Sequence, residues 1–365
     1  MTTFKPILLA ALMLVLSACR PDPQTNPPET VVLYTSTDDE FAKLVVNDFT
    51  TETGIQVKVV GDTEATKTTG LVARLKSEAT SPNTKSKADV WWSSEPFGTI
   101  DLARSGVLEP GAMKGLAPTT NNHWPESLHD PDWTWIGLAS RPRVIVYATD
   151  RITDPPSSLR EFANPKWKGR VGMARPQFGT TRGHMGILAA RWGLPEFERW
   201  LTMLNANNIR LYDGNATVVR AIAMGEIDLG LTDADDVWAG QRNGWKVGCT
   251  YEPFDPPMIL STQSSKGPTL LPNTVAIIAN APNPDNAKRL ASYLISLRVE
   301  RLLAESTSRN LPVNPELKEL FNTIAPKSLT ASDPNRLQSQ PIYPNFSDAY
   351  EMIPQALDAC DRILN

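Results

Sequence analysis

The stretch Ile209–Gln241, IRLYDGNATVVRAIAMGEIDLGLTDADDVWAGQ, predicts a strand, a helix and a second strand in succession. After the turn at Asp213, apolar residues recur at helical spacing, and Gly225 ends the helix. A short buried strand then covers Ile227–Leu231 and runs directly into an acidic cluster. The stretch therefore predicts an open α/β sheet with charged groups at the end of one strand.

The acidic cluster consists of Asp233, Asp235 and Asp236. Ligands of open α/β sheets bind just outside the carboxyl ends of the strands. Three carboxylates so close together repel one another and lose solvation, so they need a counter-charge. This pattern favours a ligand site. The alternative is an acidic turn that caps the following helix.

The N-terminal part of the mature chain repeats the same alternation of strands and helices. Its expected elements are strand Val31–Tyr34, helix Glu40–Thr53, strand Ile55–Val60, a helix through Leu71 and Leu75, and strand Ala88–Trp92. Such a βαβαβ order predicts a parallel sheet with helices on both faces. Each strand ends in polar residues, TSTDD, GDTEATKT and SSEP, which we expect along one edge of the sheet.

Two strand-like segments, Trp133–Ala139 and Arg143–Thr149, lead towards a second lobe, and Leu271–Ala279 is expected to return to the first. In the second lobe, the turn Gly179-Thr180-Thr181 opens a helix. Free backbone N–H groups and two hydroxyls at a helix start can hold an oxyanion. A plain threonine cap is the alternative.

These patterns predict an α/β protein of two lobes, each a mainly parallel sheet flanked by helices, joined by crossing hinge strands. The expected boundaries are a signal peptide over 1–18, a Pro-rich tether over 19–30, the first lobe over 31–140 with a return over 271–320, the second lobe over 141–270, and a C-terminal helical segment over 321–365.

The N-terminus predicts export. One lysine precedes an apolar run over Ile7–Leu16 that is too short to span a bilayer as a helix. Leu16-Ser17-Ala18-Cys19 resembles a bacterial lipobox, in which the cysteine is acylated and becomes the mature N-terminus. An ordinary secretory signal is the alternative. The expected location is the periplasm or cell envelope, with Cys19 anchoring the chain to a membrane by lipid.

Composition excludes several classes of function. Of 365 residues, 41% are hydrophobic and 21% charged, with a net charge of −4, so nothing is basic enough for nucleic acid. The only histidines, His123, His129 and His184, have no metal or catalytic-triad spacing. No catalytic residue is predicted. Cys249 and Cys360 could form a disulfide or remain two thiols.

The order VVLYTS, TGIQVKVV, ADVWWSSEP, WKGRVGMARP and YDGNATVVRAIAMGEIDLGLTD resembles the bacterial periplasmic ferric-ion-binding proteins. The resemblance covers nearly all of the mature chain. It implies the two-lobe periplasmic-binding-protein fold, closing like a hinge over its cargo, and the role of substrate-binding component of an ABC importer. It also implies an ABC permease and ATPase as partners and a monomeric state.

The resemblance assigns the ligand residues by position. The family's metal-binding His, Glu and tandem tyrosines correspond to Asp38, Glu95, and Asp235 with Asp236. Contacts to a synergistic anion fall on Gly179, Thr180, Thr181 and Asn215, with Asp233 where the family often has Asn. The implied cargo is Fe³⁺ or another cation, with a synergistic anion allowed beside it, and no catalytic cofactor is implied.

This sequence departs from the family at the tandem tyrosines. Asp235 and Asp236 offer hard oxygen ligands, which suit Fe³⁺ but also Ca²⁺, Mg²⁺ or Mn²⁺. The same carboxylates could face an organic cation. The alternative function is therefore a binding protein for a small organic solute, such as a phosphonate, a polyamine or a thiamine-like molecule. A metal-dependent enzyme and a sensor subunit without transport are the remaining alternatives.

Overall fold

The computed structural model describes residues 29–62, 66, 68–80, 86–117, 124–251, 268–324 and 343–364. The predicted signal peptide, Cys19 and nearly all of the tether lie outside these residues. Among the helices of the described part, none combines the length and apolar character needed to cross a membrane.

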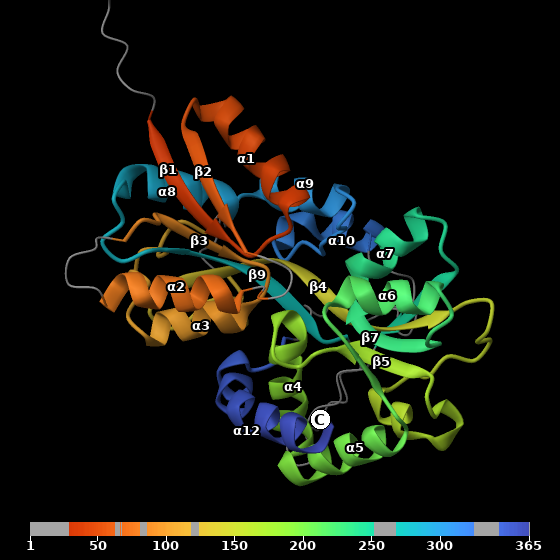
Figure 1. Ribbon diagram of the computed structural model, residues 1–365. Helices are drawn as coiled ribbons and strands as arrows, with labels where there is room; N and C mark the ends of the chain where they lie inside the picture. The colour runs from red at the N-terminus through yellow and green to blue at the C-terminus, as the bar shows by residue number, and fades with distance from the viewer. Residues whose placement is uncertain are drawn as a thin grey trace, which may run out of the picture.

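Strands and helices alternate as the sequence predicts (Figure 1). The strands are β1 (Thr30–Thr35), β2 (Gln56–Gly61), β3 (Val90–Ser93), β4 (Trp135–Ala148), β5 (Val171–Ala174), β6 (Arg210–Tyr212), β7 (Leu229–Asp233), β8 (Val247–Tyr251) and β9 (Leu270–Ile277). The helices are α1 (Asp39–Thr53), α2 (Thr69–Thr80), α3 (Pro96–Arg104), α4 (Gly179–Trp192), α5 (Leu194–Ala206), α6 (Asn215–Ala223), α7 (Ala234–Arg242), α8 (Pro284–Leu294), α9 (Leu297–Glu305), α10 (Lys318–Ile324) and α12 (Phe346–Leu364). The sequence patterns do not predict α3, α5 or α10.

Two groups of parallel strands form the two lobes. In the first lobe β1 pairs in parallel with β2 and β3, and in the second β5 pairs in parallel with β6 and β7. Antiparallel β9 and β4 stand between the groups, in the order β2-β1-β3-β9-β4-β7-β5-β6, with β8 also paired to β4. The predicted α/β fold of two mainly parallel sheets is confirmed.

One long strand, β4, joins the lobes. Its first half pairs with β9 up to Pro142, and from Arg143 onward it pairs with β7 and β8. The two segments predicted to cross between lobes are therefore halves of one strand. Its register shifts between Leu138 and Ser140, and Ala139 has a φ of 33°, so a β-bulge marks the crossing. The return strand β9 pairs with β3 of the first lobe.

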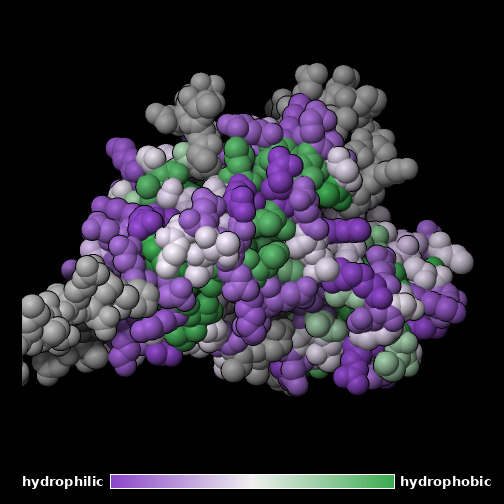
Figure 2. Space-filling model, turned by 90° about the horizontal axis from the view of Figure 1, so that it is seen from above, coloured by the Kyte–Doolittle hydropathy of each residue, from purple (hydrophilic) through white to green (hydrophobic). Residues whose placement is uncertain are grey.

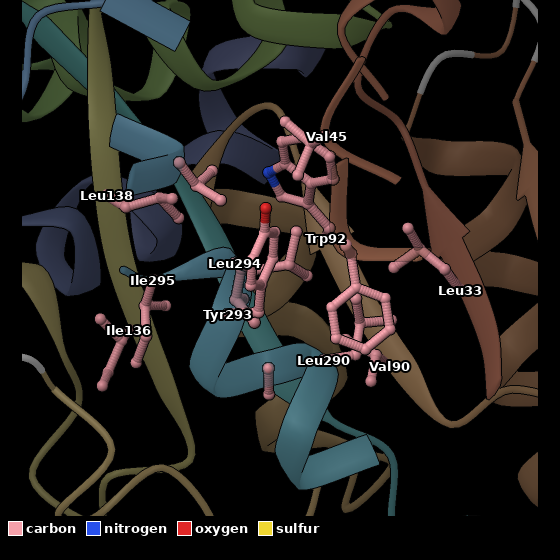
Figure 3. Packing of buried hydrophobic residues seen from close by; sticks show 14 of the residues in the cluster. Leu33, Val45, Val90, Trp92, Ile136, Leu138, Leu290, Tyr293, Leu294 and Ile295 are labelled. Carbon is pink, nitrogen blue, oxygen red and sulfur yellow. The ribbon is translucent and has the colours of Figure 1, made fainter. Parts of the chain in front are cut away.

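One hydrophobic cluster of the first lobe packs against the face of the sheet that carries Trp92. Trp92 packs there with Leu33, Val90 and the aliphatic residues of α8, as Figure 3 shows. Adjacent Trp91 belongs to a separate cluster, because consecutive strand residues point to opposite faces. Both tryptophans are fully buried, so they fix β3 and the residues that follow it rather than meet solvent.

The C-terminal helix α12 packs on both lobes. Phe346, Ala349 and Ile353 belong to the cluster beneath α2 and α3, whereas Ala356 and Cys360 belong to the core of the second lobe. Figure 1 shows α12 beside α4 and α5. The predicted C-terminal helix is therefore a bridge between lobes. Cys360 and Cys249 are both free thiols, without a disulfide.

The surface is largely hydrophilic, with hydrophobic residues showing between polar ones on the face seen in Figure 2. Among the described residues, the large hydrophobic side chains most exposed are Leu44, Val59, Met203 and Met224. They come from different parts of the chain, and the structure gives no reason to group them.

Candidate functional site

The strand ends of both lobes meet at one small cavity of about 40 Å³. The first lobe contributes Asp38, after β1, and Ser94, after β3, and the hinge strand contributes Arg141. The second lobe contributes the rest, namely Ala174, Arg175, Phe178, Gly179, Thr180, Thr181, Asp213, Gly214, Asn215, Asp233, Asp235 and Asp236. Because one water needs roughly 10–15 Å³ by this measure, the cavity has room for an ion with a few small ligands.

A buried network surrounds Asp233 at the end of β7. Its Oδ1 accepts a hydrogen bond from Arg143 Nη1 at 2.8 Å, and its Oδ2 accepts from Thr180 Oγ1 at 2.7 Å and Asn215 Nδ2 at 3.0 Å. Burial opposes ionisation of Asp233, but the charges of Arg143 and Arg141 outweigh it and hold its pKa below the usual value. Asp233 is thus a fixed negative charge.

Asp235 stands in the first turn of α7 and faces the hinge. Arg141 Nη1 approaches its Oδ2 at 3.3 Å, while Arg141 Nη2 donates to the carbonyl of Ser94 at 2.6 Å. The Oδ1 of Asp235 and the Nε of Arg141 are buried and have no hydrogen-bond partner among the described residues. Burial raises the pKa of Asp235, and the charges of Asp233 and Asp38 add to the rise against the opposing effect of Arg141. An acceptor and a donor are therefore both unmet beside the cavity.

The three clustered aspartates can converge on one cation. Carboxylate oxygens of Asp233, Asp235 and Asp236 lie within 4.8 Å of one another. Asp236 also accepts a hydrogen bond from Thr232 Oγ1 at 2.9 Å. The helical backbone of α7 lets adjacent Asp235 and Asp236 both border the cavity, which an extended segment would prevent. Carboxylate oxygens in this arrangement suit a hard cation.

Glu95 does not join this group. It is the N-cap of α3, where its side chain accepts the backbone N–H groups of Phe97 at 2.7 Å and Gly98 at 2.9 Å. It is buried and lines a second cavity beside α2 and α3. The predicted Glu ligand therefore does not line the cavity that Asp38, Asp235 and Asp236 share. Its carboxylate oxygens instead accept hydrogen bonds from the first backbone N–H groups of α3.

The residues expected to contact an anion also line the small cavity, but their side chains form hydrogen bonds with one another. Thr181 Oγ1 donates to Asn215 Oδ1 at 3.2 Å, and Thr180 Oγ1 accepts from Asn215 Nδ2 at 2.8 Å. Arg143 reaches both threonine hydroxyls, at 3.1 and 3.3 Å. Gly179 begins α4 with a φ of 58°. These contacts order the α4 start around Asp233.

Two buried arginines belong to the site and are not among the residues predicted from the sequence. Arg141 and Arg143 are both buried, and each pairs with one aspartate of the cluster. The available signal was the need of crowded carboxylates for a counter-charge, together with Arg143 in a segment predicted to cross between the lobes and Arg141 two residues before it. Their pairing could not be read from spacing, since each aspartate is about 90 residues away in the chain.

Residues 45–335 match a family model described as bacterial extracellular solute-binding protein. The chain belongs to this family. Among similar proteins, the major ferric iron-binding protein of Neisseria meningitidis is 26% identical over 294 residues, which are 80% of this chain and 83% of that one. Iron uptake protein A1 of Synechocystis is 28% identical over 320 residues, with 80% of each chain covered.

A solved structure of similar fold is the ferric binding protein from Campylobacter jejuni, with a TM-score of 0.72 and 17% identity over 91% of this chain and 99% of that one. It supports the two-lobe fold. Members of the solute-binding family work with the permease and ATPase components of ABC transporters, and the family is one of transport proteins rather than of enzymes.

Proposed function

We propose that this protein captures ferric iron, or another hard cation, in the cavity between its lobes and delivers it to an ABC importer. The observation that carries the proposal is the convergence of Asp233, Asp235 and Asp236, whose oxygens lie within 4.8 Å of one another, with one oxygen of Asp235 that receives no hydrogen bond from the described part of the chain. Hard oxygen donors match Fe³⁺, and the similarity to iron-binding proteins points to the same cargo.

The small volume of the cavity supports an ion over an organic solute. About 40 Å³ is far below the roughly 300–1,000 Å³ of pockets that enclose drug-sized molecules. Arg141 and Arg143 neutralise part of the negative charge of the three aspartates. The cluster therefore keeps a net negative charge that attracts a cation, and the arginines stabilise it when no cation is bound. No tyrosine stands among the described residues that line the cavity, and Asp235 and Asp236 take the positions of the family's tandem tyrosines.

The test is calorimetric titration of Asp235→Asn with Asp236→Asn against ferric nitrilotriacetate, Ca²⁺, Mn²⁺ and small organic cations. Losing two charge-assisted ligands should weaken binding of the cargo by at least about 100-fold. The matched control is Asp285→Asn with Asp358→Asn, which removes two exposed aspartates on α8 and α12. Unchanged affinity in the site variant would reduce the aspartates to a helix cap, and preference for an organic cation would favour the alternative solute.

Lipid attachment is a separate part of the proposal. A lipobox-like sequence precedes Cys19, and several acyl chains hold a protein on a membrane far more firmly than one. Replacing Cys19 with Ala should release the protein into the soluble fraction after cell breakage, while the unmodified chain sediments with membranes. A variant that still sediments would contradict the lipid anchor and leave the cargo site untouched.

A further inference from the structure

A guanidinium stands among the aspartates that line the small cavity. Arg141 enters from the hinge strand and is buried, with 7% of its surface exposed. Burial opposes its positive charge, but the fields of Asp235, Asp233, Asp38 and Asp236 outweigh burial and raise the pKa of the guanidinium. The cluster proposed to hold a cation therefore contains a cation that belongs to the protein itself.

The two buried arginines of β4 are held differently. All three guanidinium nitrogens of Arg143 donate hydrogen bonds, and its contact with Asp233 measures 2.8 Å. Among the described residues, Arg141 donates only through its two terminal nitrogens, to the Ser94 carbonyl at 2.6 Å and to Asp235 Oδ2 at 3.3 Å. Its Nε–H and the Oδ1 of Asp235 are buried and receive no partner from the described part of the chain. Arg143 is thus fully bonded, whereas the pair between Arg141 and Asp235 is incomplete.

The pair between Arg141 and Asp235 has the features of an interaction that can be exchanged. Hydrogen bonds between a guanidinium and a carboxylate usually measure about 2.7–2.9 Å and are often bidentate, so a single contact of 3.3 Å is weak. A cation that binds Asp235 lies beside the guanidinium, and like charges repel strongly where little water screens them. Cargo and Arg141 therefore compete for the same carboxylate.

We propose that Arg141 is an internal competitor of the cargo and makes the site selective for multivalent cations. Its guanidinium pairs with Asp235 when no cargo is bound and releases it when a cation of higher charge takes its place. The bond to the Ser94 carbonyl keeps the side chain at the hinge. A monovalent cation offers Asp235 no more charge than the guanidinium does and lacks its covalent attachment, which gives Arg141 a high effective concentration. This proposal rests on the cation-binding function above and adds the residue that selects the charge of the ion.

The experiment offers the site a free guanidinium ion. Calorimetry measures the binding of guanidinium chloride, Ca²⁺ and ferric nitrilotriacetate to the mature full-length protein and to Arg141→Ala, with potassium chloride added to equalise ionic strength. The variant lacks the whole side chain, so a guanidinium ion can take the place of the missing group. We expect Arg141→Ala to bind guanidinium and ferric nitrilotriacetate each at least about tenfold more tightly than the parent.

Competition between the two probes tests whether they share one place. Guanidinium should weaken the binding of ferric nitrilotriacetate to Arg141→Ala back towards the affinity of the parent. In the parent protein the same concentration of guanidinium should change that affinity by less than about twofold, because Arg141 already occupies the place.

A second variant tests the charge of Arg141 without creating a large space. Arg141→Gln keeps a donor for the Ser94 carbonyl and removes only the positive charge. It should bind ferric nitrilotriacetate more tightly than the parent and should gain no guanidinium binding. The matched control is Arg199→Ala on α5, an exposed arginine that pairs only with Glu196 among the described residues. The control should keep every affinity within about twofold of the parent.

A purely structural role for Arg141 predicts the opposite result. If both variants bind ferric nitrilotriacetate no more tightly than the parent, the internal competitor is overturned while the cation site stands. If neither the parent nor the variants bind a metal ion, the cation function fails. Guanidinium binding by Arg141→Ala, and not by the parent, would then still support the part of the inference that excludes monovalent cations.

Discussion

Arg141 and Arg143 stand two positions apart on β4, so their side chains leave the same face of the strand. Arg143 is fully buried and holds Asp233, whereas Arg141 links the Ser94 carbonyl of the first lobe to Asp235 of the second. Breaking a buried pair leaves an uncompensated charge, which is strongly destabilising. The arginines therefore keep the aspartates in place while the cargo is absent, and one of them ties the lobes together.

The raised pKa of Asp235 predicts a pH dependence of cargo binding. A cation binds the ionised carboxylate, so affinity should be full above this pKa and fall as pH drops through it, beginning above the ordinary value of about 4. Asp233, whose pKa is lowered, should stay ionised over the same range.

The check is titration with ferric nitrilotriacetate between about pH 4 and 7 for the parent and for Asp235→Asn. Protonation of the chelator affects both proteins equally, so the difference between their slopes reports Asp235. Parallel slopes would contradict the role assigned to its charge.

The bulge in β4 decides where the hinge arginines point. An extra residue in a strand reverses which side chains face each side, so Ala139 sets the orientation of Arg141. Two buried side chains hold the bulge: Glu300 of α9 accepts the Ala139 N–H at 2.8 Å, and Asn273 of β9 donates to the Ala139 carbonyl. Glu300 also accepts the N–H groups of Val313 and Asn314.

We expect Glu300→Ala to lower thermal stability and cargo affinity together. The substitution leaves three backbone N–H groups without their acceptor, and each such buried group costs about 1–3 kcal/mol of stability. It also removes a hydrogen bond that holds the bulge, which orients Arg141. Glu300→Gln keeps an acceptor oxygen and should lose less. Glu305→Gln, an exposed change on the same helix, is the control. Stability lost without any loss of affinity would mean that Glu300 does not position the hinge.

The whole molecule is held by contacts that cross between lobes. Helix α4 packs so tightly on α3 that a Cβ at Gly183 would meet the Phe97 ring at 2.0 Å. The buried residues of α12 before Pro354 belong to the cluster that contains α2 and α3, and those after it belong to the core of the second lobe, whereas half-buried Met352 and Leu357 each pack against the other cluster. A proline within a helix removes a backbone hydrogen bond, so it gives α12 a natural place to bend when the lobes move.

Cargo binding should close the lobes, and Gly183→Ala should hinder closure. The added methyl group collides with Phe97 across the interface, although alanine favours the helix itself. Small-angle scattering should show a smaller radius of gyration for the parent protein at saturation with ferric citrate, and a smaller change for the variant. Gly61→Ala, where a Cβ meets nothing within 4 Å, is the control. A radius of gyration that stays constant on binding would contradict hinge closure.

The sequence by itself determined the elements and the edge on which the site lies. Apolar periodicity placed β1, α1, β2, β7 and β9 within a few residues, because burial of one face is a local requirement of each element. The polar residues after β1, β3 and β7 predicted the cavity, since parallel strands bring their carboxyl ends to one edge, whereas none of the described residues in the polar stretch after β2 lines it.

Only the tertiary structure decided how each charged side chain is used. Glu95 turned out to cap α3, since the nearest unmet donors after β3 are the N–H groups of that helix. Asp233 and Asp235 meet arginines that approach from the hinge strand, and the hydroxyls of Thr180 and Thr181 are used by Arg143 and Asn215. The spacing of residues within a segment shows which polar groups that segment carries. The partners of those groups are distant in the chain, so only the packing of the lobes determines which charges and hydrogen-bonding atoms remain available to a ligand.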